Sequence, residues 1–131
     1  MNRLDDVLIL VVDDDPDVLD GIDLALRSEG ARTLRAIDGN EAILFWRSHA
    51  PEVVVLDMML PKRSGFLVLE ELTGSETPPI VVMVTANEGK RHMSYAKLLG
   101  VHAYLNKPIP LETLIQTISD LRGEGSPPAS E

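Results

Sequence analysis

The chain contains three short apolar runs that do not alternate with polar residues. They are Val7–Val12, Val53–Leu56 and Ile80–Val84, and all three are rich in valine and isoleucine. A strand with one face in water alternates in polarity, whereas a strand buried on both faces reads as a continuous apolar run. The runs therefore predict the central strands of a parallel sheet that is covered on both faces.

Helical patterns separate these runs. Asp15 followed by Pro16 is typical of a helix start, and Gly30 of a helix end. The remaining predicted elements are strands at 32–37 and 102–105 and helices at 39–48, 64–73, 88–99 and 111–121. Five strands and five helices in strict alternation predict a doubly wound α/β fold with a five-stranded parallel sheet.

The length of 131 residues is that of one domain. We expect this domain at residues 1–122 and a flexible tail or linker at residues 123–131, which are Gly, Ser, Pro and acid, with no output domain after it. The run at 7–12 is too short for a signal peptide, and no stretch approaches the ~20 apolar residues of a membrane span. We therefore expect a cytoplasmic protein without membrane contact.

Composition excludes several classes of site. The chain has no cysteine, so disulfides, cysteine zinc sites and thiol nucleophiles are excluded. Its net charge of −9 should repel nucleic acid, and we expect no direct nucleic-acid binding.

Polar residues follow four of the predicted strands. Asp13 and Asp14 follow the first, Asp57 the third, Thr85 ends the fourth, and Lys107 follows the fifth. Ligands of open α/β sheets bind beyond the carboxyl ends of the strands. If the first and third strands are neighbours, the three carboxylates converge at one crevice.

Such convergence is costly. Two unit charges 4 Å apart repel by about 4 kcal/mol at an effective dielectric near 20. The site therefore needs a cation, or a proton on a carboxyl group whose pKa is raised. A donor set made of oxygen atoms suits a hard ion such as Mg²⁺. With a hydroxyl and an ammonium beside it, the set has the parts needed for phosphoryl transfer.

Four motifs occur in order at the spacing of a whole domain. They are VVDDDP at 11–16, VVLDMMLP at 54–61 with Gly65, VTA at 84–86 and AYLNKP at 103–108. Over residues 6–122 the chain resembles the receiver domain of two-component response regulators, the CheY-like proteins. The resemblance implies the sheet order 2-1-3-4-5.

The resemblance also implies roles for individual residues. Asp57 would be the nucleophile that forms an aspartyl phosphate. Asp14 and Asp57 would ligate Mg²⁺ directly, together with the backbone carbonyl of Met59, and Asp13 would act through water. Met59 also occupies a position that tunes the lifetime of the phosphoryl group in the family.

Further roles concern the fourth and fifth strands. Thr85 and Lys107 would each bind a phosphoryl oxygen, and the Lys107–Pro108 bond is expected to be cis. After phosphorylation Thr85 would move inward and Tyr104 would turn into the vacated space. This switch would alter the face formed by the fourth helix, the fifth strand and the fifth helix.

By the same resemblance, the phosphodonor would be a histidine kinase, a histidine phosphotransfer protein or a small phosphodonor. The receiver would catalyse only its own phosphorylation and slow dephosphorylation, and would not be an enzyme otherwise. A downstream output protein or domain is expected, and so is a phosphorylation-dependent homodimer.

The chain departs from the family pattern at Leu60, where methionine is common, and at Ser64, where an acid is frequent. We expect little effect from either. Asn87 occupies the second position that tunes phosphoryl lifetime. Gly89 should loosen the first turn of the fourth helix.

Two other functions are compatible with such a fold. A receiver-like module that binds partners without phosphorylation usually lacks the acceptor, the acid pair or the lysine, and this chain has them all. A Mg²⁺-dependent phosphohydrolase of the Asp-x-Asp type needs an acid where Met59 stands.

Two further kinds of binding site are disfavoured by local sequence. A flavin-binding flavodoxin is disfavoured because the loop after the first strand is acidic. An EF-hand is excluded because Val18 stands where glycine is needed.

Overall fold

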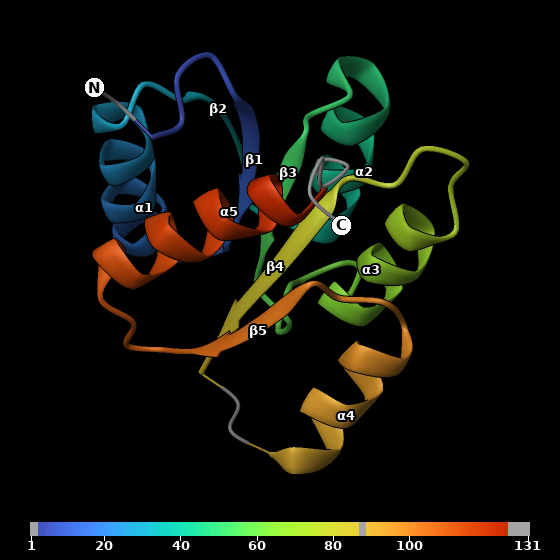
Figure 1. The fold of residues 1–131 in the computed structure, drawn as a ribbon. Coiled ribbons are helices and arrows are strands. Elements are labelled where there is room, and N and C mark those ends of the chain that lie inside the picture. The colour runs from blue at the N-terminus through green and yellow to red at the C-terminus, as the bar shows by residue number, and fades with distance from the viewer. Residues whose placement is uncertain (1–2, 87–88, 126–131) are drawn as a thin grey trace.

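A computed structural model describes residues 3–86 and 89–125 (Figure 1). The strands are β1 (Leu8–Val12), β2 (Arg32–Ala36), β3 (Val53–Leu56), β4 (Ile80–Thr85) and β5 (Ala103–Asn106). The helices are α1 (Pro16–Ser28), α2 (Gly39–His49), α3 (Gly65–Thr73), α4 (Lys90–Leu98) and α5 (Leu111–Gly125). The alternation predicted from the apolar runs is confirmed.

The strands form one parallel sheet in the order β2-β1-β3-β4-β5, which confirms the expected fold class. Val12 pairs with Leu56, so β1 and β3 end at the same level. The Asp57 N–H donates to the Val12 carbonyl over 3.0 Å and continues this pairing one residue further. The register therefore places the acids that follow β1 and β3 side by side.

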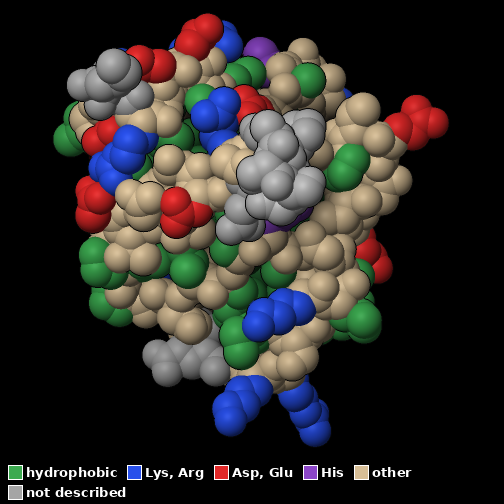
Figure 2. Space-filling model, in the orientation of Figure 1, with side chains coloured by type: hydrophobic (Ala, Val, Ile, Leu, Met, Phe, Trp, Pro, Cys, Tyr) green, Lys and Arg blue, Asp and Glu red, His purple; other side chains and the backbone are tan. Residues whose placement is uncertain are grey.

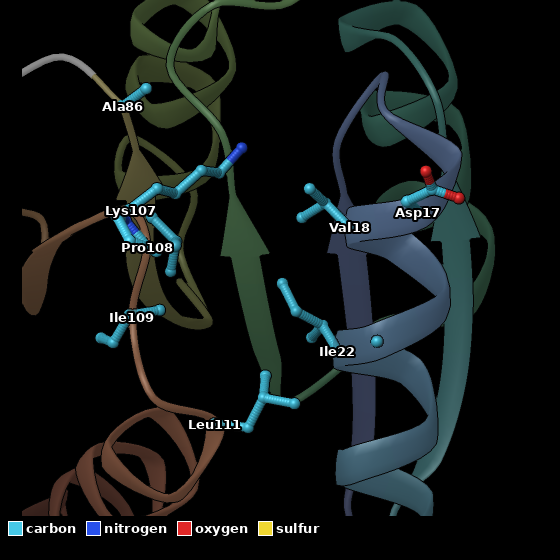
Figure 3. Close-up of a pocket in the computed structure, with 10 residues that line it drawn as sticks. Asp17, Val18, Ile22, Ala86, Lys107, Pro108, Ile109 and Leu111 are labelled. Carbon is cyan, nitrogen blue, oxygen red and sulfur yellow. The ribbon is translucent and has the colours of Figure 1, made fainter.

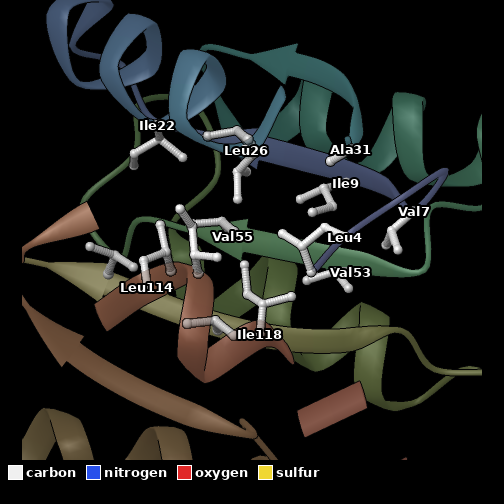
Figure 4. Close-up of a cluster of buried hydrophobic side chains, with 14 of the residues drawn as sticks. Leu4, Val7, Ile9, Ile22, Leu26, Ala31, Val53, Val55, Leu114 and Ile118 are labelled. Carbon is white, nitrogen blue, oxygen red and sulfur yellow. The ribbon is translucent and has the colours of Figure 1, made fainter. Parts of the chain in front are cut away.

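Helices cover both faces of the sheet, as the continuous apolar strands require. On one face α1 and α5 bury Leu19, Ile22, Leu26, Leu114, Ile115 and Ile118 against β1, β3 and β4 (Figure 4). On the other face α2, α3 and α4 bury Ala42, Ile43, Val68, Leu69, Leu72 and Ala96. Successive strand residues point to opposite faces, so each strand contributes to both clusters.

The predicted boundaries of α1 are confirmed. The Asp15 side chain caps the helix and accepts a hydrogen bond from the Asp17 N–H at 2.9 Å. Gly30 follows the helix with a φ of 93°, in the left-handed region that glycine adopts at least cost.

Most other elements begin or end a residue or more away from the predicted position, and specific contacts explain two of these differences. β5 begins at Ala103, one residue later than predicted. At His102 the Val81 N–H donates to the side-chain Nδ1, at 3.0 Å, and not to a backbone carbonyl. α5 continues to Gly125, beyond the predicted end of the domain at residue 122. Packing of Leu121 on the core and the ion pair of Arg122 with Glu52, at 2.8 Å, support this last turn despite its glycines.

Asn87 and Glu88, and the tail from residue 126, lie outside the described residues. Within the described part of the chain, no helix has the length and apolar character needed to cross a membrane.

Candidate functional site

Three carboxylates converge where β1 and β3 end. Asp13 and Asp57 are buried, with 3% and 6% of their surface exposed, whereas Asp14 is exposed. One oxygen from each of the three lies within 4.8 Å of the others. The convergence predicted from the strand ends is thus present, and its cause is the shared register of β1 and β3.

Lys107 reaches this group from the edge of the sheet. Its Nζ lies 2.6 Å from Asp13 Oδ2 and 3.9 Å from Asp57 Oδ2. Its backbone N–H donates to the Thr85 carbonyl at 2.8 Å, and the bond to Pro108 is cis. The ammonium therefore lies between the two buried carboxylates and pairs most closely with Asp13.

The Asp57 carboxyl group is in an unfavourable environment for its charge. Burial raises its pKa, and the nearby charge of Asp13 raises it further, while Lys107 opposes both. The Met59 N–H is 3.5 Å from Asp57 Oδ1, which is the outer limit of a hydrogen bond. One ammonium therefore does not compensate fully for the cost of the buried charge.

The donor set fits a hard divalent cation. Its members are carboxylate oxygens, with neither cysteine nor histidine among them. Two of the carboxylates are buried and one faces solvent, so an ion bound there could keep part of its water shell, as Mg²⁺ does. The raised pKa of Asp57 supports the same assignment, because a cation would relieve the repulsion that raises it.

The loop after β3 is held against α3 by Gly65. The Gly65 N–H donates to the Met58 carbonyl at 2.8 Å. A Cβ atom on this glycine would overlap the Asp57 carbonyl oxygen, so no larger residue fits without moving the loop. Met59 lies in the same loop and exposes 65% of its surface.

The two predicted switch residues lie on β4 and β5. Thr85 is fully buried at the end of β4. Tyr104 is half-buried, and its hydroxyl donates to Met58 Sδ over 4.0 Å, a long and weak contact. Burial and the charge of Asp57 raise the pKa of Tyr104. Sequence reasoning missed Met58 as the link between Tyr104 and the acceptor loop, because nothing in a buried methionine reveals its neighbours.

An apolar hollow of about 460 Å³ adjoins the site between α1 and the segment that follows β5. Figure 3 shows Val18 and Ile22 of α1 on one side and Lys107, Pro108 and Ile109 on the other. Most of its lining is apolar, and Asp17 and Lys107 are its charged members.

A family model described as the response regulator receiver domain matches residues 9–119. Protein PilH of Pseudomonas aeruginosa is 34% identical over 113 residues, which cover 85% of this chain and 93% of PilH. The probable transcriptional regulatory protein TcrX of Mycobacterium tuberculosis is 39% identical over 110 residues, which cover 83% of this chain but 47% of TcrX.

Solved structures agree with these matches. A CheY-like receiver domain protein from Methanospirillum hungatei has a TM-score of 0.87 and 25% identity, covering 91% of this chain and 95% of that one. The receiver domain of a Francisella response regulator has a TM-score of 0.85 and 26% identity, covering 91% and 98%.

Proposed function

Because the chain belongs to the family of response regulator receiver domains, we propose that it accepts a phosphoryl group on Asp57 and signals through this modification. The observation that carries the proposal is the convergence of Asp13, Asp14 and Asp57 within 4.8 Å, with Lys107 Nζ 3.9 Å from Asp57 Oδ2. A nucleophile, anionic ligands for a metal and a cation for the phosphoryl group then share one crevice.

Mg²⁺ is the proposed cofactor. Asp14, Asp57 and the Met59 backbone carbonyl would hold it directly, and Asp13 would act through water. When bound, the ion would neutralise charge on the carboxylates and on the phosphoryl oxygens. The chain's own contribution is the register of β1 and β3, which holds two of these acids in place before any ligand binds.

In the proposed transfer step, Asp57 supplies the nucleophile and other groups of this chain bind the phosphoryl oxygens. A carboxylate oxygen of Asp57 forms the new P–O bond while the P–N bond of a donor phosphohistidine breaks, and the electron pair of that bond stays on the imidazole. Lys107 and the hydroxyl of Thr85 bind phosphoryl oxygens. In leaving its 2.6 Å contact with Asp13, Lys107 would free that acid for the water that links it to the metal.

The positions of Thr85 and Tyr104 support a role in switching. Thr85 is buried at the end of β4, and Tyr104 packs beside Met58 in the acceptor loop. We infer that phosphorylation draws Thr85 toward Asp57 and lets Tyr104 turn further inward. The face made by α4, β5 and α5 would change as a result. The phosphoryl group would shift the equilibrium between the two conformations because it interacts more favourably with one of them.

Receiver domains are signalling phospho-acceptors, and their partners are in general a histidine kinase and an output domain or protein. For this chain we propose a histidine kinase or histidine phosphotransfer protein as the donor, acting in the cytoplasm. Catalysis would be limited to its own phosphorylation and slow dephosphorylation. A phosphorylation-dependent homodimer through the α4, β5 and α5 face is a further proposal.

Intact-mass measurement after incubation with acetyl phosphate and Mg²⁺ tests the proposal. We expect one added phosphoryl group in the wild type, and none in Asp57→Ala or in the presence of EDTA. Absence of any adduct with small phosphodonors would support a module that binds partners without phosphorylation. Rapid multiple turnover of a phosphate ester would instead support a phosphohydrolase.

A further inference from the structure

The helix α4 has little to stabilise it by itself. Of its nine described residues, Ala96 alone is buried. Gly89 provides no side-chain cap, and Lys90 and Arg91 place positive charge in the first turn, which the helix dipole disfavours. Because so short a helix is unstable alone in water, its contacts with the rest of the fold must hold it in place.

One side of α4 faces solvent. The helix lies at the lower end of the molecule in Figure 1, and Figure 2 shows Lys and Arg side chains that extend from this end. These are the exposed side chains of Lys90, Arg91 and Lys97. The contacts that hold the helix therefore come from its opposite side.

On that opposite side, a single aromatic side chain of α3 contacts two rings of α4. The Phe66 ring stacks on the His92 imidazole, with the ring centroids 5.8 Å apart and the planes at 17°. It also packs edge-on against the Tyr95 ring, with the centroids 5.1 Å apart. His92 and Tyr95 are three residues apart, which places them on the same side of α4. We define the aromatic clasp as Phe66, His92 and Tyr95.

The other connection of Phe66 leads to the acceptor loop, residues 57–64. Its chain neighbour Gly65 donates its N–H to the Met58 carbonyl at 2.8 Å. A Cβ atom on Gly65 would overlap the Asp57 carbonyl oxygen, so the first turn of α3 packs directly on the acceptor backbone. Close-packed groups transmit displacements to one another. A shift of the backbone at Asp57 and Met58 should therefore move Gly65, and Phe66 with it.

We propose that the aromatic clasp couples the acceptor loop to α4 through the first turn of α3. Phosphorylation of Asp57 would shift Phe66, and its two ring contacts would pass this shift to the N-terminal half of α4. The route is separate from Thr85 and Tyr104, which lie on β4 and β5. The inference rests on the proposed function, because it concerns how phosphorylation of that site is transmitted.

The contacts of the clasp suit this role. The Tyr104 hydroxyl meets Met58 Sδ over 4.0 Å, a weak contact, whereas the Phe66 ring meets two rings at separations typical of favourable aromatic pairs. Phosphorylation can shift α4 only through groups whose interactions differ between the two states. Ring contacts depend on distance and orientation, so a small movement of Phe66 changes their strength.

Hydrogen exchange of the full chain, with and without acetyl phosphate and Mg²⁺, tests the coupling. Intact mass gives the fraction of each sample that is phosphorylated. In the wild type we expect phosphorylation to change the exchange rates of α4 amides by about threefold or more. In Phe66→Leu, Asp57 should still accept one phosphoryl group, and the change at α4 should fall below about twofold.

The other phenylalanine of the chain provides a matched control. Phe45 is also partly buried against the same apolar cluster, and its ring packs edge-on against His49 of its own helix at 6.3 Å. Phe45→Leu removes the same atoms without changing the clasp, so α4 should respond as in the wild type. Tyr95→Leu opens the clasp from its exposed side, with less risk to folding, and should act as Phe66→Leu does. Circular dichroism checks that each variant folds.

A further variant tests whether the two routes are separate. Tyr104→Leu should leave part of the response of α4, and its combination with Phe66→Leu should remove nearly all of it. Complete loss in Tyr104→Leu alone would overturn the proposal, because the clasp would then transmit nothing by itself.

An undiminished response of α4 in phosphorylated Phe66→Leu or Tyr95→Leu would also overturn it. So would an equal loss in Phe45→Leu, since any weakening of the core would then have the same effect. Absence of a phosphoryl adduct in the wild type would instead contradict the proposed function. The hold of the clasp on α4 is measured separately in the unmodified chain, where Phe66→Leu should accelerate exchange at α4 and Phe45→Leu should not.

Discussion

At the scale of single residues, the site is defined by charges that the fold holds apart from water. Asp13 and Asp57 are buried, and Lys107 lies between them. Burial penalises an ionised group unless a partner compensates it. Removal of the Asp57 charge and removal of the Lys107 charge should therefore change the stability of the fold in opposite directions.

Asp57→Asn should stabilise the fold at neutral pH in the absence of Mg²⁺. The pKa of Asp57 is raised in the folded state, chiefly by burial, so its ionisation at neutral pH costs folding free energy. The amide removes this cost, and we expect a gain of about 1 kcal/mol, or roughly 4 °C in Tm. As pH falls through the folded-state pKa, the wild-type carboxyl group becomes protonated and the gain should decrease, and it should disappear below the pKa of the unfolded state.

Thermal unfolding of both proteins over a pH series measures this difference. A gain that is the same at every pH would mean that the charge of Asp57 is not its source.

Lys107→Met should destabilise the fold, because Asp13 would lose the ammonium 2.6 Å away while remaining buried. We expect a loss of about 1–3 kcal/mol in chemical denaturation without Mg²⁺. Added Mg²⁺ should restore part of the loss by replacing the missing positive charge. Lys97→Met is the control, since this exposed lysine has no ion pair among the described residues and should change stability by less than about 0.5 kcal/mol. Equal losses in the two variants would contradict the role assigned to the Lys107–Asp13 pair.

At the scale of elements, α4 differs from the other helices in how its charges are ordered. Lys90 and Arg91 lie in its first turn and Lys97 in its last turn. The helix dipole disfavours cations at the first position and favours them at the last. One charge reversal should therefore have opposite effects at the two ends of the same helix.

Lys90→Glu should stabilise the chain by about 0.3–1 kcal/mol, and Lys97→Glu should destabilise it by a similar amount. Both changes alter the net charge equally, so their difference isolates position on the helix. Urea denaturation at low and high salt provides the measurement, and the difference should shrink as salt screens the dipole. Two effects of the same sign would show that net charge, and not the helix dipole, controls the result.

At the scale of the whole molecule, one crevice brings together residues that follow three strands of the sheet, β1, β3 and β5. A ligand that binds the folded state alone raises apparent stability by mass action. The acids that would bind Mg²⁺ come together only when β1 and β3 are paired. The metal should therefore behave as a stabilising ligand of the complete fold.

We expect Mg²⁺ at about a hundredfold excess over its Kd to stabilise the wild type by roughly 2.7 kcal/mol. Differential scanning calorimetry at constant ionic strength, with NaCl as the reference salt, tests this. Asp57→Asn should lose most of the Mg²⁺-dependent increase in Tm. An equal increase in that variant would place the ion elsewhere.

Much of the molecule follows from the sequence alone. The continuous apolar runs at 7–12, 53–56 and 80–84 identify buried parallel strands, and the residues that follow them can be read directly. Asp15 and Gly30 mark the ends of α1 because capping chemistry is local. Assignment of the sheet order depended on resemblance to a family, since no pattern within one strand reveals its neighbour.

Only the tertiary structure decided which charges meet. Lys107 pairs most closely with Asp13, 94 residues away, and Tyr104 contacts Met58. The tertiary structure also shows that every lysine and arginine outside α4 has an acidic partner, which cannot be inferred from the composition. The physical reason is that periodicity and caps are set by neighbours along the chain, whereas burial and Coulomb energy depend on distances that exist only after the sheet has formed.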